Sequence, residues 1–161
     1  MRKPISIKLM VLLSLVIGVM ALLSYKFIKK KTISMNQCAA LITEGRESEK
    51  IIARFQRVIT IIDKKGFYRD TGVFLEGEKK WRLNRFYTIS LELISGYKYE
   101  LRVLHQEKSD DDNVPDAALK ILRPEQGREI NITSIEEVFP DVWLFSGVAF
   151  PLFACKELKR N

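Results

Sequence analysis

The strongest constraint on the fold is the alternation of apolar and polar side chains in residues 81–93, WRLNRFYTISLEL. Successive side chains of a β-strand point to opposite faces, so this segment has one apolar and one polar face. The alternation fails at Arg85, which falls on the apolar face, and at Phe86, which falls on the polar face. A strand with one wet face is typical of an antiparallel sheet that covers a core on one side.

Similar period-two segments fill most of the chain after residue 36 and are separated by turn signals. We expect further strands at 50–62, 67–77, 97–104 and 128–135, and a last strand or pair of strands at 142–155. The first four of all these strands are joined by short turns and therefore form an antiparallel meander, because parallel neighbours need long crossovers. A short helix is expected between Pro115 and Leu122, and Gly147 is expected to mark a bulge or a bend.

These signals predict an all-β domain of six to eight strands with one short helix. Uniform strand spacing and a single apolar face favour a sheet curled on itself, which closes its own edges. A barrel or half-barrel is the preferred architecture, and a two-sheet sandwich is the alternative.

A different segment, residues 9–25 (LMVLLSLVIGVMALLSY), contains no charged side chain. A helix of about 17 to 25 apolar residues can span a bilayer. A buried core helix would present a polar face, and a cleaved signal peptide would end in small residues. Neither feature is present, so we predict a single transmembrane helix that acts as an uncleaved signal anchor.

The chain is thus divided into four parts. Residues 1–31 form a short basic leader and the anchor, 32–36 a tether, 37–157 an exported β domain and 158–161 a charged tail. Three basic residues precede the span and four follow it, so the positive-inside rule gives no orientation. The short leader and the cysteine usage favour a cytoplasmic N-terminus and an exported C-terminus.

The net charge of +7 lies entirely in this N-terminal part. Residues 1–31 hold seven basic residues and no acidic one, whereas the rest of the chain holds 20 of each sign. A nucleic-acid-binding domain carries a basic patch. The β domain is therefore expected to make no direct contact with nucleic acid, and the bilayer is the partner of the basic segment.

The two cysteines, Cys38 and Cys155, stand at opposite ends of the β domain. A disulfide between them is permitted if the domain is exported. It requires the first and last strands to be neighbours, with Cα atoms about 5.5 to 6 Å apart. We predict this structural disulfide. Two separate buried thiols and a redox-active pair are the alternatives.

No residue pattern points to catalysis, a metal or a cofactor. The single histidine, His105, continues the inward phase of the preceding strand and has no nearby thiol. The acidic run KSDDDN at 108–113 lacks the glycine and distal glutamate of a calcium loop, so a solvated acidic loop is expected. We predict that the protein is not an enzyme, and a periplasmic enzyme built around His105 is the least favoured hypothesis.

Aromatic residues are abundant in the β domain and would fill the interior of a small barrel. In a roomier barrel they could line an apolar ligand pocket. The candidate lining residues are Trp81, Tyr97, Tyr99 and Trp143.

The anchor, the early Cys38, the stretch KSDDDNVPD at 108–116 and the ending PLFAC at 151–155 together resemble a known family. The chain looks like the FidL-like family of small enterobacterial inner-membrane proteins, although its middle motif is one residue longer before the asparagine. This resemblance implies a single-pass inner-membrane protein with a periplasmic domain and no established catalytic activity. It also implies a partner, because such proteins are often encoded beside membrane-anchored transcriptional regulators of the ToxR/CadC type.

Two functions follow as expectations. The first is a non-enzymatic binding module that assists such a regulator, with edge-strand addition as one mode of contact. The second is a periplasmic sensor or carrier domain for an amphipathic small ligand, which requires an interior cavity.

Overall fold

The computed structural model describes residues 13–20, 33–122 and 131–158. The chain divides into two compact units, residues 1–32 and 33–161. In the first unit, residues 13–20 are helical and their apolar side chains are exposed. Within the described residues, no helix has the length and apolar character needed to cross a membrane. The predicted span at 9–25, the leader and most of the charged tail lie largely outside those residues.

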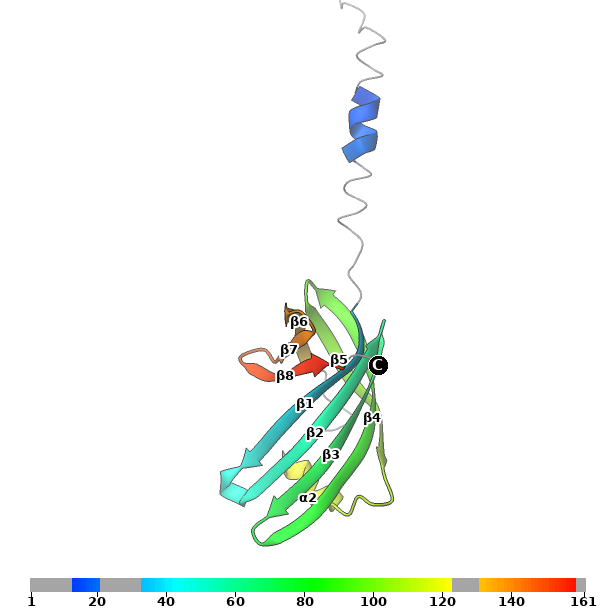
Figure 1. Ribbon diagram of the computed structural model, residues 1–161. Coiled ribbons are helices and arrows are strands. Elements are labelled where there is room, and N and C mark those ends of the chain that lie inside the picture. The colour runs from blue at the N-terminus through cyan, green and yellow to red at the C-terminus, as the bar shows by residue number, and fades with distance from the viewer. Residues whose placement is uncertain (1–12, 21–32, 123–130, 159–161) are drawn as a thin grey trace, which may run out of the picture. The chain divides into compact units, whose positions relative to one another are not determined.

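The second unit is a closed barrel of eight antiparallel strands in chain order, each hydrogen-bonded to the next (Figure 1). A 3-10 turn, η1, joins the first two strands, and a short helix, α2, stands between the fifth and sixth. The elements are β1 Ser34–Arg46, η1 Glu47–Glu49, β2 Ile51–Ile62, β3 Lys65–Glu76, β4 Lys79–Ser95, β5 Lys98–Lys108, α2 Asp116–Leu122, β6 Asn131–Phe139, β7 Val142–Ser146 and β8 Pro151–Glu157. This confirms the barrel and the short helix, and it replaces the sandwich alternative.

The first strand begins earlier than the sequence suggested. Residues 32–36 were expected to be a tether, but β1 starts at Ser34. The reason is burial, since Ile33 and the fully buried Met35 belong to the core of the barrel. Of the two expectations for 142–155, a strand or a pair of strands, the pair is confirmed, since β7 and β8 form a hairpin and the chain turns at 147–150.

The barrel has two distinct ends, which we name by the chain termini. Because the strand number is even, β1 starts and β8 finishes at one end, the terminal end. The connections at 62–65, 95–98 and 139–142 lie at this end as well. The opposite, distal end holds η1, the β3–β4 turn, the loop 109–115 and α2.

The strands on the two sides of the barrel differ in length. Strands β2, β3 and β4 contain 12, 12 and 17 residues, whereas β6, β7 and β8 contain only 9, 5 and 7. Strand β5 pairs with β6 only over residues 98–101, and β8 pairs with β1 only at Cys38 and Ala39. The short strands therefore close the barrel near its terminal end alone.

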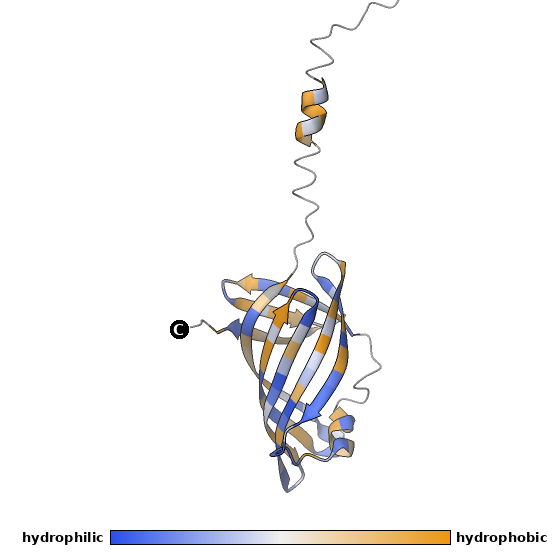
Figure 2. Ribbon diagram, turned by 90° about the vertical axis from the view of Figure 1, so that its right-hand side faces the viewer, coloured by the Kyte–Doolittle hydropathy of each residue, from blue (hydrophilic) through white to orange (hydrophobic). Residues whose placement is uncertain are grey.

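Side chains alternate between the core and solvent along the long strands. Figure 2 shows hydrophilic and hydrophobic residues interspersed along these strands. The inward side chains pack into one core. Its largest fully buried members include Phe74, Leu83, Tyr87, Ile89, Ile135 and Phe145.

The alternation shifts phase once in β5. Thr88 pairs with His105 while Ile89 pairs with Val103, so Leu104 is an extra residue in the ladder. A β-bulge of this kind turns the following side chains to the other face. His105 is therefore exposed, and the expectation that it points inward is wrong.

Candidate functional site

The predicted disulfide between Cys38 and Cys155 is present, with Cα atoms 5.5 Å apart. Both cysteines are buried, and they lie where β1 meets β8. The two strands share only two register pairs, at Cys38 with Glu157 and Ala39 with Lys156. The disulfide is thus the covalent part of the seam that closes the barrel.

The four candidate pocket residues do not come together. Trp81 pairs with Phe74 near the distal end, where their ring centroids are 5.8 Å apart. Tyr99 pairs with Leu93 near the terminal end, about 40 Å further along β4 at about 3.3 Å per residue.

The other two candidates also differ in their surroundings. Tyr97 is exposed in the β4–β5 turn. Trp143 lies in β7 opposite Cys155, and its indole Nε1 donates to Glu157 at 3.4 Å. No single pocket can be lined by all four residues.

The middle of the barrel is instead occupied by a buried ion pair. Arg57 donates through Nε and Nη2 to the two carboxylate oxygens of the fully buried Asp70, at 2.7 and 2.8 Å. The guanidinium carbon lies 4.4 Å from the ring centroid of Tyr68, 5.5 Å from that of Phe55 and 5.4 Å from that of Phe153. Arginine stacks on aromatic faces in this way, so the cation is both paired and packed.

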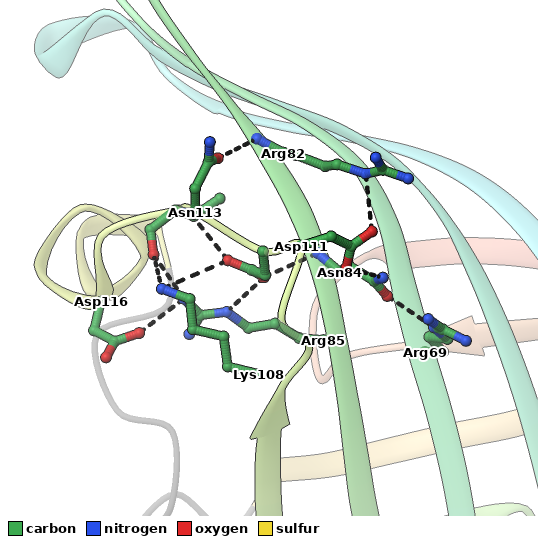
Figure 3. A network of polar contacts seen from close by, with 10 residues as sticks. Arg69, Arg82, Asn84, Arg85, Lys108, Asp111, Asn113 and Asp116 are labelled. Atoms are coloured by element: carbon green, nitrogen blue, oxygen red, sulfur yellow. Dashed lines mark hydrogen bonds and ion pairs between the residues drawn. The ribbon is translucent and has the colours of Figure 1, made fainter.

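A second buried network closes the distal end, and Arg85 is its centre (Figure 3). The side chain of Arg85 is 1% exposed. Its Nε donates to Asp112 at 3.1 Å, and its Nη2 contacts Asp116 at 2.7 Å and donates to the carbonyl of Val114 at 3.0 Å. Arg85 therefore points inward although it interrupts the apolar face of β4, and these acceptors compensate its buried charge.

Asp112 organises the loop that follows β5. Its carboxylate accepts from the Arg85 guanidinium, from the backbone N–H of Asn84 at 2.9 Å and from that of Val114 at 2.9 Å. Lys108 adds a donor to the Val114 carbonyl at 2.9 Å. The prediction of a solvated acidic loop is wrong for Asp112, whose side chain is fully buried.

The same loop runs along the edge of β4 in place of a strand. Ser109 donates its N–H to the carbonyl of Asn84, and Asn113 both donates to the carbonyl of Arg82 and accepts from its N–H. On the outer surface Asn84 links Arg69 to Asp111, at 2.8 and 2.6 Å. These bonds satisfy backbone groups of β4 that lie beyond its pairing with β5, which ends at Arg85 and Lys108.

Arg57 and Arg85 are the cations of these two buried networks. Each buried cation contacts carboxylates of the chain, and the described residues contain no group of histidine, cysteine and acidic side chains that could hold a metal ion. Outside these two networks, burial raises the pKa of the Tyr99 hydroxyl.

Neither ion pair was predicted from the sequence. The one available signal was the cationic residue at an apolar position of β4.

The outer surface offers a different kind of site beside β5. Phe67 and Phe86 point outward from β3 and β4, each 37% exposed, with ring centroids 6.0 Å apart and stacked. The bulged Leu104 on β5 is 58% exposed. We call Phe67, Phe86 and Leu104 the outer apolar patch. Among the described strands, residues 102–108 of β5 pair with β4 alone, so the patch borders an open strand edge.

Comparison with protein-family profiles and with curated protein sequences gives no significant match to this chain.

Proposed function

We propose that the protein is a non-enzymatic binding module that recognises a protein partner through the open edge of β5 and the outer apolar patch. The observation that carries this proposal is the combination of a filled middle and a partly open rim. Arg57, Asp70 and the surrounding rings occupy the middle of the barrel, while residues 102–108 of β5 have β4 as their one neighbour among the strands that the structure describes.

Such an edge suits β-strand addition. An added strand gains main-chain hydrogen bonds from the edge, and neighbouring side chains provide specificity. Here the nearby outward side chains are Leu104 on β5, Phe86 on the adjacent β4 and Phe67 on β3. Exposed aromatic side chains next to an unpaired edge form a typical recognition surface, because aromatic residues dominate binding energy at interfaces.

We further propose that the chain is a single-pass protein of the bacterial inner membrane, with a cytoplasmic N-terminus and a periplasmic barrel. The apolar, uncharged residues 9–25 support the anchor. The disulfide supports an oxidising compartment, since such bonds persist in the periplasm and are rare in the cytosol. The resemblance to the FidL-like family suggests a membrane-anchored regulator of the ToxR/CadC type as the partner.

The alternative of an amphipathic-ligand carrier has weaker support. Its four lining residues are spread over both ends and the outside of the barrel. An ion pair packed against three rings occupies the middle. An apolar ligand there would have to separate Arg57 from Asp70 and leave buried charges unpaired, which is strongly unfavourable.

Site-specific photocrosslinking of the full-length chain in intact cells tests the binding proposal. A photoreactive residue at Leu104 is expected to crosslink to a membrane-anchored regulator, and the same residue at Leu41 on β1 is expected not to. Leu41 is a suitable control because it is 88% exposed and lies on another strand.

A substitution series tests the patch itself. Phe86→Lys should reduce the crosslink from the photoreactive residue at position 104, and Leu104→Lys and Phe86→Lys should each reduce the regulator's transcriptional output. Ile52→Lys, at 38% exposure on β2, should change neither the crosslink nor the output. Unchanged output in both patch variants with unchanged crosslinking in Phe86→Lys, or equal losses at Ile52, would remove the basis of the proposal.

A further inference from the structure

The terminal end of the barrel collects exposed apolar side chains from three separate connections. Ile62 precedes the β2–β3 turn, Ile94 and Tyr97 flank the β4–β5 turn, and Phe139 starts the β6–β7 turn. Their exposed fractions lie between 52% and 69%. Turn residues of a water-soluble barrel are normally polar, so apolar side chains on three adjacent turns indicate contact with another phase or molecule.

The two ends of the barrel also differ in charge. The terminal-end turns carry Lys64, Lys65 and Lys98 against Asp63 and Asp141. The distal-end connections, α2 included, carry eight carboxylates against four basic residues. These groups are Glu47, Glu49, Glu76, Glu78, Asp110, Asp111, Asp112 and Asp116, and Arg46, Lys50, Lys79 and Lys120. An anionic surface would therefore attract the terminal end and repel the distal end.

The chain also enters the barrel at the terminal end. Ile33 is the first residue of the barrel unit, and only residues 26–32 separate it from the apolar stretch 9–25. Seven residues reach at most about 25 Å when fully extended. Four of the seven are lysines.

We infer that the terminal end of the barrel rests on the surface of an anionic phospholipid bilayer. Tyr97 and Phe139 lie in the interfacial region, where aromatic rings are favoured. Lys64, Lys65 and Lys98 contact the lipid phosphates. This inference rests on the proposed membrane anchor. It adds that the barrel has a fixed orientation, with the distal end directed away from the membrane.

Fluorescence quenching by brominated lipids tests this orientation in the full-length chain. The protein is reconstituted into vesicles of brominated phosphatidylcholine and phosphatidylglycerol, and alkaline carbonate extraction first establishes whether it is integrated. Tyr97→Trp in a background of Trp81→Phe and Trp143→Phe reports on the terminal end. Trp143→Phe alone keeps the native Trp81 as the distal reporter, and Phe139→Trp provides a second terminal position if the first variant does not fold.

The expected result is a severalfold loss of fluorescence at position 97 or 139, with Trp81 unaffected. Replacing Lys64, Lys65 and Lys98 by glutamine should weaken association of this end with phosphatidylglycerol by about fivefold per lysine, and the quenching should fall accordingly. It should also fall as the ionic strength rises.

Two results would overturn the inference, and they are distinguishable. Extraction of the chain by carbonate would refute the anchor and, with it, the membrane contact. An integrated chain whose terminal reporters are unquenched, or quenched no more than Trp81, would refute the contact alone and assign the apolar turns to a protein partner.

Discussion

Reduction of the Cys38–Cys155 disulfide should remove a large part of the barrel's stability. The bond joins residues 117 positions apart, so it closes a loop that includes nearly the whole barrel. In the chain-entropy model, a loop of this size lowers the entropy of the unfolded chain by about 16 cal/mol/K. At 25 °C this stabilises the folded state by about 5 kcal/mol. The seam has little else to offset the loss, since β1 and β8 share two register pairs and one further backbone bond from Leu158 to Gln37 at 2.6 Å.

The assay is equilibrium urea denaturation of the full-length chain in detergent micelles, with and without reductant. With an m-value of about 2 kcal/mol/M, the midpoint should fall by about 2.5 M on reduction. The two tryptophans provide separate probes, because Trp143 lies opposite Cys155 at the seam and Trp81 lies at the distal end. Reduction leaves both sulfur atoms in place, so the comparison excludes the packing loss that a Cys→Ala pair would add.

Two outcomes would refute this reasoning. A midpoint change below about 0.5 M would show that the loop-entropy term is not realised. A transition seen by Trp143 well before that of Trp81 would show that the seam opens locally, and the single two-state free energy would then not apply.

Three further predictions concern single side chains. Asp112→Ala should destabilise the fold by about 3 kcal/mol, because it leaves the buried Arg85 guanidinium without its closest buried carboxylate; urea denaturation measures the loss. Gly72→Ala should lower the free energy of unfolding by about 3 kcal/mol or more, since the new Cβ would lie 2.2 and 2.5 Å from backbone atoms of β2. Gly147→Ala is the control, because its new Cβ would have its nearest atom at 3.6 Å, and thermal denaturation should show almost no change in stability. Burial raises the pKa of Tyr99 above its ordinary value of about 10, so the unfolded chain loses this proton first and stability should fall as the pH rises above about 10; Tyr99→Phe should flatten that fall in a pH series of unfolding curves, and an unchanged slope would contradict the assignment.

The barrel architecture could be predicted from the sequence because apolar and polar residues alternate regularly along the long strands. Strand β4 repeats with period two over most of its length, and short turns leave antiparallel pairing as the only option. The cysteine pair followed from the same reasoning, since the first and last strands of a closed sheet are neighbours. These features depend on local periodicity, which a sequence displays directly.

The features that the sequence did not reveal depend on long-range partners. The inward Arg85 is stabilised by Asp112 and Asp116, which are 27 and 31 positions further along the chain, and period-two reasoning cannot pair them. The exposed His105 depends on one extra residue, Leu104, which changes the face without changing the residue types. The aromatic residues looked alike in the sequence, yet register places Trp81 and Tyr99 at opposite ends.

The proximity of the barrel's first and last residues has a consequence for how its chain can be connected. Leu158 donates its N–H to the carbonyl of Gln37, and Asn36 contacts the side chain of Glu157. A short linker could therefore join the two termini of the barrel, and new ends could be opened in the β3–β4 turn. Such a circular permutant would convert the seam into an ordinary hairpin, so that its closure would become a local event in folding and would no longer require the two extremes of the chain to meet.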